Sequence, residues 1–291
     1  MAATPPVVLT IAGFDPSSGA GVTADIKTIA AHECYGVACI TALTIQSTQG
    51  VRRVQAVDPN LIAETLEELV SDLTVAAVHI GMLGDGRVVE VVTNFLEQAS
   101  PEKVRLPHVV LDPILKSSSG TDLLDAAGTR LLIERLVPLA EMVTPNLEEA
   151  SALTGMAVTN LEQMGQAAAR LHGLGAANVV VTGGDLEKAI DLLSFSTAGG
   201  AEREIFKADR QRSNATHGTG CAFSTALACH LAHGRGIPEA VLLSKAYVSA
   251  AIANAHPLGK GTGPLHHLFR LGQQRRPSAI VSETEHVHSR N

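Results

Sequence analysis

The stretch Asn214-Ala-Thr-His-Gly-Thr-Gly-Cys-Ala-Phe-Ser-Thr-Ala-Leu-Ala228 places small and flexible residues directly before a helical pattern. Gly218 and Gly220 allow the backbone to approach a bound group closely. The free N–H groups of a helix start, together with the helix dipole, favour a negative charge. The stretch therefore predicts an anion hole at Gly218, Thr219 and Gly220 that can hold a phosphate during transfer. A plain helix entry is the alternative. A Walker A loop is excluded, because no Gly-Lys-Ser/Thr follows.

Cys221 falls in the first turn of this predicted helix. Because helix N-termini lower the pKa of a thiol, Cys221 is a candidate for a polarised group at the reacting centre. The alternative is a small buried apolar residue. A thiol hydrolase that pairs Cys221 with His217 as nucleophile and base is a rival hypothesis. It is disfavoured because catalytic pairs usually come from distant segments.

Outward from this stretch, short apolar runs alternate with amphipathic segments, which predicts βαβ units and a mostly parallel sheet. Val109–Leu111 and Val179–Val181 are apolar throughout, as strands covered on both faces should be. The expected strands are Val7–Ile11, Val37–Thr44, Val75–Ile80, Val109–Leu111, Met142–Thr144 and Asn178–Thr182, with Ile190–Phe195 and Ile205–Ala208 as an antiparallel pair. The expected helices are Gly21–His32, Pro59–Asp72, Arg87–Gln98, Thr129–Leu136, one from Leu147, Leu161–His172, Thr219–Ala232 and Glu239–Ala255.

We expect a single domain over residues 1–270. Residues 271–291 are expected to form a mobile tail in which His286 and His288 are solvated.

Ligands of such sheets bind beyond the carboxyl ends of the strands. Several of these ends carry glycine, proline or polar residues, which also fits ordinary turn chemistry. The strand ends concerned lie at Gly13, Gln46, Gly81-Met82, Asp112, Asn146 and Gly184. The first loop, residues 13–25, has glycines at 13, 19 and 21 and lacks the Gly-x-Gly-x-x-Gly spacing, so a dinucleotide-binding dehydrogenase is disfavoured. Asp25 lies near the helix start and either complements the dipole or accepts hydrogen bonds from a ligand.

Composition excludes several classes of protein. Of 291 residues, 3% are aromatic and none is Trp, which argues against a binder of single-stranded nucleic acid. The 22 Lys and Arg against 29 Asp and Glu give a net charge of −7, so we expect no nucleic-acid or anionic-membrane partner. The four cysteines form no Cys-x-x-Cys pair, which disfavours a zinc site. Without a signal peptide or an apolar span, the chain is expected in the cytoplasm.

Seven motifs in the same order give the chain a family resemblance. They are Thr10–Thr28, Ile40–Gln46, His79–Leu83, Val110–Pro113, Thr144–Ala150, Thr216–Cys221 and Gly261–His267. In these motifs the chain resembles the hydroxymethylpyrimidine/phosphomethylpyrimidine kinases of thiamine biosynthesis. These belong to the ribokinase-like superfamily. The resemblance implies a three-layer α/β/α domain with a mostly parallel central sheet. It also implies a homodimer that transfers phosphate from ATP, with Mg²⁺, to an aminopyrimidine alcohol and then to its monophosphate.

The resemblance also assigns roles to residues. It implies that Gly13, Asp25, Gln46 and Met82 line the pyrimidine pocket, where the amide of Gln46 suits an aminopyrimidine edge. Residues implied for the nucleotide are Asn146, Thr182 and Gly184, and those for Mg²⁺ are Asp112 and Glu149. Gly218, Thr219, Gly220 and Cys221 match the anion hole, with Cys221 as a weak base or a neighbour of the transition state.

Two departures from the family pattern affect the phosphate contacts. The lysine of Leu115-Lys-Ser-Ser-Ser-Gly120 is shifted, so Lys116 receives no assigned role. Thr182-Gly-Gly-Asp185 lacks the usual lysine. A pyridoxal kinase of the same lineage is the nearest alternative. Some of those kinases carry a lid cysteine, and residues 116–121 contain none. A non-catalytic ligand-sensing domain on the same fold is the alternative from another class.

Overall fold

A computed structural model describes residues 4–98, 106–184, 186, 189–197, 200–209, 211 and 213–273. Nine strands in these residues form one sheet in the order β3-β2-β1-β4-β5-β6-β7-β8-β9. The strands are β1 Val7–Phe14, β2 Tyr35–Ser47, β3 Gly50–Ala56, β4 Val75–Ile80, β5 Val109–Leu111, β6 Met142–Val143, β7 Asn178–Gly183, β8 Ala189–Thr197 and β9 Gly200–Ala208. Neighbours from β2 to β7 pair in parallel, whereas β3, β8 and β9 pair antiparallel to their neighbours.

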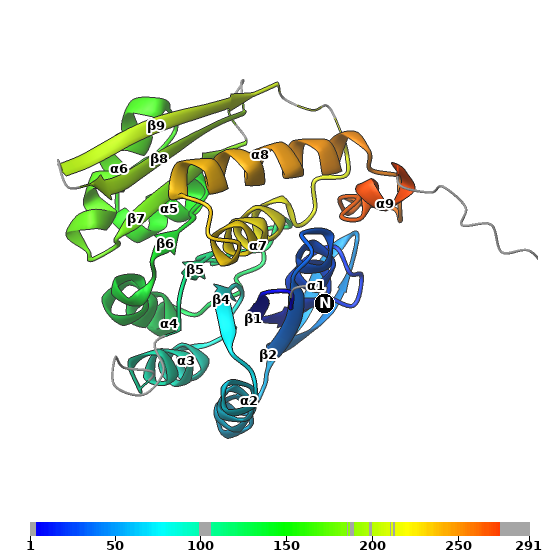
Figure 1. The fold of residues 1–291 in the computed structure, drawn as a ribbon, viewed down its shortest axis with the longest axis vertical. Helices are drawn as coiled ribbons and strands as arrows, with labels where there is room; N and C mark the ends of the chain where they lie inside the picture. Colours follow the sequence, from blue (N-terminus) through cyan, green and yellow to red (C-terminus); the bar gives the residue numbers. More distant parts are fainter. Residues whose placement is uncertain are drawn as a thin grey trace, which may run out of the picture.

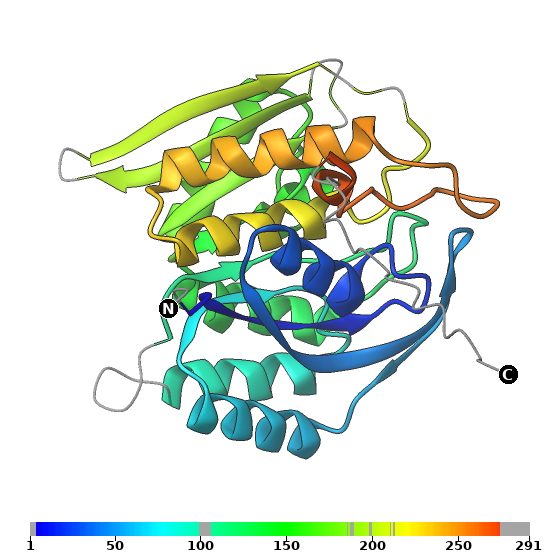
Figure 2. The same cartoon turned by 45° about the vertical axis from the view of Figure 1, so that its right-hand side comes forward.

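Helices cover both faces of the sheet, as Figures 1 and 2 show, and complete the three layers expected from the sequence. On one face lie α2 Pro59–Asp72, α3 Gly86–Gln98, α4 Ala126–Leu131, α5 Leu147–Thr154 and α6 Leu161–Gly173, packed on the larger apolar core. On the other face lie α1 Gly21–Ala31, α7 Thr219–Ala232 and α8 Ile237–Ala253. A short helix, α9 Phe269–Gln273, follows.

The chain reverses its direction of travel across the sheet between β1 and β4. It leaves β1 for β2 on one side, and after the β2–β3 hairpin it returns to β4 on the other side of β1. In sheets of this kind, ligands bind at the carboxyl ends of the strands beside such a switch. The residues that follow β1 and β4, including Asp15 and Met82, lie at this position.

Local signals explain most element boundaries. Asp58 caps α2 by accepting a hydrogen bond from the Asn60 N–H, and Pro59 occupies the first turn. The predicted helix at Thr129–Leu136 begins earlier, at Ala126, because Asp125 caps it through Gly128 N–H. It continues as a π-turn over Leu132–Leu136. Likewise α8 begins at Ile237 rather than Glu239.

The sequence-based prediction of the β2 region was incomplete. The strand predicted as Val37–Thr44 extends to Ser47 and turns into β3, which was not predicted. Gly50 makes this hairpin turn with a φ of +127°. The expected tail differs as well, since residues 271–273 end α9. Residues 274–291, with His286 and His288, and also Asp185, lie outside the described residues.

Replacing Leu111 at the centre of the sheet tests how much of the stability depends on this core. Leu111 on β5 is fully buried between neighbours of the larger core. Leu111→Ala should lower the free energy of unfolding by about 2–5 kcal/mol, because a cavity remains where the side chain was. Leu61→Ala on α2, at a side chain 57% exposed, is the matched control and should change it by less than about 0.5 kcal/mol. Urea unfolding of both variants measures the difference, and equal effects would contradict this placement of the core.

Candidate active site

The residues predicted to form an anion hole lie at the start of α7. Gly218 is the N-cap, with a left-handed φ of +81°, and no side chain caps the helix. The first N–H groups of α7 are thus left without a side-chain cap, as an anion-binding helix start requires. A Cβ on Gly218 would overlap the carbonyl oxygen of Gly19, so only glycine fits between the two loops.

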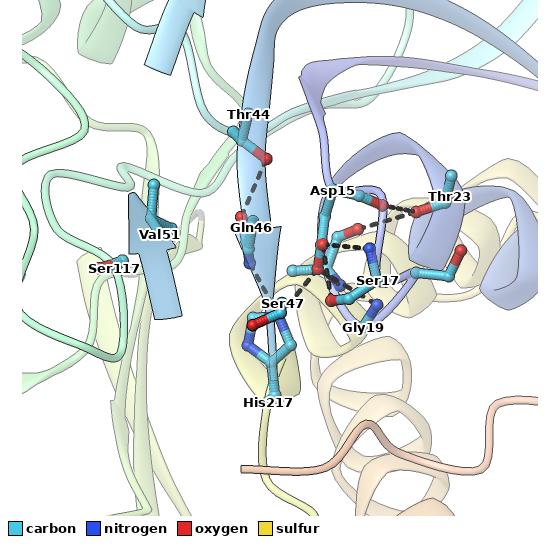
Figure 3. Close-up of polar contacts among 12 residues, drawn as sticks. Asp15, Ser17, Gly19, Thr23, Thr44, Gln46, Ser47, Val51, Ser117 and His217 are labelled. Carbon is cyan, nitrogen blue, oxygen red and sulfur yellow. Dashed lines mark hydrogen bonds and ion pairs between the residues drawn. The ribbon is translucent and has the colours of Figure 1, made fainter. Parts of the chain in front are cut away.

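Asp15, which was not singled out as a site residue, organises the loop after β1. Its carboxylate accepts hydrogen bonds from Ser17 N–H at 2.8 Å, Ser17 Oγ at 2.7 Å and Ala20 N–H at 3.0 Å. Its Oδ2 also lies 2.9 Å from Nε2 of His217, on the segment before α7 (Figure 3). Burial opposes ionisation, but the hydrogen bonds from His217 and Ser17 hold the pKa of Asp15 below its usual value. The ionised carboxylate thereby joins the two glycine-rich loops.

Three of the four predicted pocket residues lie at the carboxyl ends of neighbouring strands. Gly13 is the last residue but one of β1, Gln46 holds the same place in β2, and Met82 follows β4. A Cβ on Gly13 would lie 2.9 Å from the Met82 sulfur, so these two residues are in contact. Met82 packs with Ala42 and Leu123 in a small apolar cluster. The structure therefore brings Gly13, Gln46 and Met82 to one end of the sheet.

Asp25 differs from both interpretations of the sequence. Its carboxylate is 0% exposed and lies beyond the first turn of α1. It accepts hydrogen bonds from Thr10 Oγ1 at 2.7 Å and from Thr225 Oγ1 at 2.9 Å. His79 Nδ1 lies 3.5 Å from the same carboxylate. All of these contacts are with buried side chains, and the one with Thr225 connects Asp25 to α7. In this structure the carboxylate therefore neither lies at the start of α1 nor faces solvent.

A buried polar chain connects Asp25 to Asp112, which follows β5. His79 Nε2 lies 3.0 Å from Ser224 Oγ, and this hydroxyl lies 3.2 Å from Asp112 Oδ2. Burial alone would lower the pKa of His79, but the charge of Asp25, its hydrogen bond and the charge of Asp112 together outweigh burial and raise that pKa. Burial raises the pKa of Asp112 to about 6. A Cβ on Gly220 would lie 3.8 Å from Asp112 Oδ2, so this carboxylate lies beside the anion hole.

Cys221 does not have the lowered pKa that its place in the helix suggested. The side chain is 8% exposed. Burial, followed by the charges of Asp112 and Asp25, raises the pKa of the Cys221 thiol well above its usual value. Desolvation and like charge outweigh the helix dipole here. The thiol is therefore protonated near neutral pH, and His217 is bonded to Asp15, so the nucleophile–base pair of a thiol hydrolase is not present.

The two residues predicted for Mg²⁺ differ in their surroundings. Glu149 forms a capping box with Asn146 at the start of α5: Asn146 N–H donates to Glu149 Oε2 at 2.9 Å, and Glu149 N–H donates to Asn146 Oδ1 at 2.9 Å. Burial and the charge of Asp112 raise the pKa of Glu149 well above its usual value. Two buried carboxylates that repel each other fit a divalent cation, which prefers oxygen ligands and would relieve the repulsion. Within the described part of the chain, no group of three or more His, Cys, Asp or Glu side chains could hold a metal by itself.

The residues predicted for the nucleotide follow β6 and end β7. Asn146 and Thr182 form an isolated parallel bridge, and Thr182 N–H donates to Pro145 O at 2.9 Å. A Cβ on Gly184 would meet no atom within 4 Å, so the space beside it is open. The side chain of Asn146 already accepts a hydrogen bond in the capping box. Capping of α5 therefore explains an asparagine at this position, with or without a ligand contact.

Lys116 lies in a small hairpin that faces the β2–β3 turn. Lys116 and Asp122 form an antiparallel bridge, and the exposed Lys116 Nζ lies 3.7 Å from Asp122 Oδ1. Thr121 Oγ1 donates to Val51 O at 3.3 Å, which joins this hairpin to β3. In this structure the charge of Lys116 is therefore paired with that of Asp122.

Similar folds are found among solved kinase structures. The pyridoxal kinase of Bacillus subtilis, in an ADP complex, has a TM-score of 0.81 and 33% identity and covers 92% of this chain and 100% of that chain. The pyridoxal kinase of Staphylococcus aureus with AMP-PCP and pyridoxal has a TM-score of 0.79 and 31% identity, covering 91% and 94%. The phosphomethylpyrimidine kinase of Clostridium difficile has a TM-score of 0.73 and 34% identity, covering 85% and 99%. The fold thus defines a phosphotransferase of the ribokinase-like class.

Sequence comparisons narrow this class to a family. A family model described as phosphomethylpyrimidine kinase matches residues 15–266. The hydroxymethylpyrimidine/phosphomethylpyrimidine kinase of Salmonella typhimurium is 41% identical over 263 residues, 89% of this chain and 96% of that protein. The thiamine biosynthesis bifunctional protein ThiED of Geobacter sulfurreducens is 41% identical over 264 residues, 90% of this chain and 52% of that longer protein. The chain belongs to the phosphomethylpyrimidine kinase family.

A methyl group at Gly218 tests the contact between the two loops. Gly218→Ala should lower kcat at least about tenfold, because alanine is strained by about 1–2 kcal/mol in the left-handed region and its Cβ would displace the Gly19 carbonyl. Gly173→Ala at the end of α6, where a Cβ meets no atom within 4 Å, is the control and should keep the wild-type rate. Steady-state kinetics decide, and full activity of Gly218→Ala would contradict this geometry.

Thiol labelling tests the protonation of Cys221. Because its pKa is raised, Cys221 should react with iodoacetamide slowly at pH 7.5 and faster only above pH 9. Cys34 is an internal control. A hydrogen bond with Cys229 and the nearby His233, whose Nε2 lies 3.3 Å from the Cys34 sulfur, lower the pKa of Cys34 although burial opposes them. Peptide mass spectrometry should therefore find Cys34 labelled first, and prior labelling of Cys221 would show that its thiol is ionised.

Proposed function

We propose that the chain is a kinase that transfers phosphate from ATP to the hydroxymethyl group of 4-amino-5-hydroxymethyl-2-methylpyrimidine and then to the resulting monophosphate, in thiamine biosynthesis. The observation that carries this proposal is the uncapped start of α7 beside the buried carboxylate of Asp112, in a chain of the phosphomethylpyrimidine kinase family. The nucleotides named with the related pyridoxal kinase structures, ADP and AMP-PCP, support ATP as the phosphate donor.

In this proposal the anion hole binds the phosphate being transferred. The N–H groups of residues 218–221 surround its oxygens, and the helix dipole stabilises the negative charge. Asp112 and Glu149 would hold Mg²⁺ together with the ATP phosphates, and the cation would neutralise charge in the transition state. Cys221 stays a protonated neighbour of the reacting atoms, which the loose transition state of phosphoryl transfer tolerates because it needs little help from a base.

Two regions suit the rest of the nucleotide. We assign the phosphate-proximal part to Asn146, Thr182 and Gly184, at the ends of β6 and β7. We assign the nucleoside part of ATP to a cavity of about 430 Å³. The cavity is lined by residues 213–215, which precede α7, and by residues 255–261 and 263.

Gly13, Gln46 and Met82 hold the pyrimidine in this proposal. Met82 and Gly13 give an apolar wall, and the Gln46 amide offers a donor and an acceptor to the ring edge. Pyridoxal phosphorylation is the second candidate, since pyridoxal kinases share the fold. The absence of a cysteine from residues 116–121 and the names of the curated relatives favour the pyrimidine.

We also propose that one domain, residues 1–270, carries the activity and acts as a cytoplasmic homodimer. Leu43 and Ile45 on β2 are 50% and 47% exposed, which leaves an apolar strip on the edge hairpin that a second copy would cover. In the described part of the chain, no helix has the length and apolar character needed to cross a membrane.

A direct assay tests the activity. Purified protein with ATP, Mg²⁺ and the pyrimidine alcohol should yield the monophosphate and then the diphosphate by mass spectrometry, and EDTA should stop both steps. Asp112→Asn should lower kcat about 100-fold or more, because it removes charge that holds the cation. A higher kcat/KM for pyridoxal than for the pyrimidine would favour the second candidate, and no product from either alcohol would refute the kinase proposal.

A further inference from the structure

The side chain of Gln46 lies between Thr44 and His217, as Figure 3 shows. Its Oε1 is 3.2 Å from Thr44 Oγ1, and its Nε2 is 3.1 Å from His217 Nε2. The Thr44 hydroxyl also lies 3.0 Å from the carbonyl oxygen of Phe14. Which atom of the amide faces which neighbour decides what Gln46 presents to a ligand, because the two ends of an amide are a donor and an acceptor.

The partners of His217 determine where its hydrogen lies. Asp15 Oδ2 is 2.9 Å from His217 Nε2, and an ionised carboxylate can only accept a hydrogen bond. His217 Nε2 therefore carries a hydrogen and cannot accept one from the Gln46 amide. The single hydroxyl hydrogen of Thr44 can be donated to Phe14 O at 3.0 Å or to Gln46 Oε1 at 3.2 Å. We place it in the shorter contact, to Phe14, which leaves Thr44 Oγ1 as an acceptor for Gln46.

A half-turn of the Gln46 amide satisfies every one of these groups. Its Oε1 then faces His217 and accepts from the N–H that is shared with Asp15, while its Nε2 faces Thr44 Oγ1 and donates to it. The two ends of an amide are interchangeable in shape, so the half-turn needs no other movement. Within the described residues, one N–H and one lone pair of Gln46 then have no partner, and they form an adjacent donor and acceptor.

His217 itself is held on several sides. Its backbone N–H donates to Gly263 O at 3.1 Å. Its ring is 12% exposed, and a Cβ on Gly19 would overlap it. Asp15 is in turn fixed by Ser17 and Ala20. The imidazole therefore cannot turn away to suit another orientation of the Gln46 amide.

We propose that His217, anchored by Asp15, is a positioning residue that orients the Gln46 amide and so determines which substrate ring the site prefers. The preferred ring edge has an acceptor nitrogen beside an amino group, as in an aminopyrimidine. A pyridine alcohol such as pyridoxal has no amino group beside its ring nitrogen. It therefore cannot pair with both the N–H donor and the oxygen acceptor that Gln46 offers. This inference rests on the proposed function, in which Gln46 contacts the pyrimidine.

A double-mutant cycle tests whether His217 acts through Gln46. The readout is the ratio of kcat/KM for the pyrimidine alcohol to kcat/KM for pyridoxal. His217→Leu should lower this ratio about tenfold, mainly through KM for the pyrimidine, since one oriented hydrogen bond is lost. Gln46→Leu should lower it at least as much, and the double variant should lower it no further than Gln46→Leu. His217→Gln, whose amide can donate to both Asp15 and Gln46, should recover most of the ratio.

Two kinetic outcomes would overturn the inference. Independent effects that add in the double variant would show that His217 does not act through Gln46. An unchanged ratio in His217→Leu, with both substrates slowed equally, would reveal a structural role only.

A ligand-free measurement separates this inference from the proposed function. Nitrogen-15 NMR of the wild-type protein should find hydrogen on Nε2 of His217, whatever substrate the enzyme uses. A neutral ring with its hydrogen on Nδ1 alone would overturn the inference even if the pyrimidine is the substrate. A wild-type enzyme that phosphorylates neither alcohol, yet carries the Nε2 hydrogen, would instead refute the proposed function.

Discussion

The buried carboxylate of Asp15 is the interaction on which the geometry of the site depends. It lies where the chain leaves β1, and it accepts hydrogen bonds from Ser17, Gly19 and Ala20 while contacting His217. A buried charge is tolerated only when its lone pairs are satisfied, and here the loop folds around the carboxylate to do so. This one group sets the entry to α1, the position of the segment before α7, and through His217 the side chain of Gln46.

The buried carboxylates that lie between α7 and the sheet are stabilised in a different way. Asp25 and Asp112 lie in a region without bulk water, and His79 and Ser224 connect them. The small residues of α7 allow the helix to approach this chain of polar groups closely. The helix start adds partial positive charge on the other side. Burial, the largest cause, raises the pKa values of Asp112 and Glu149. In the function proposed above, a cation and phosphates would bind here together.

Much of the parallel sheet could be predicted because strands buried on both faces carry continuous apolar runs, such as Val75–Val78 in β4, all of β5 and Val179–Val181 in β7. The β2–β3 hairpin was harder to predict. Arg52 and Arg53 on β3 are exposed, and its apolar residues Val51 and Val54 are only partly buried, against the small cluster around Met82. The strand therefore lacks the continuous apolar run that marks the central strands. The glycine-rich start of α7 could be predicted because its glycines and the helix that follows are adjacent in the chain. Asp15 and His217 stood within the two loops already singled out, but 202 positions separate them and no local pattern connects them.

The sequence by itself determined the family, the three-layer fold and most of the parallel strands, because these depend on local periodicity and on motifs of adjacent residues. Tertiary structure decided what individual groups do. Asp25 looked available to a ligand and is enclosed by Thr10 and Thr225. The Cys221 thiol was expected to have a lowered pKa, and burial beside Asp112 raises it. Desolvation and the charge of distant neighbours act through space, so the pKa and the hydrogen-bond partners of a side chain follow only once the chain has folded around it.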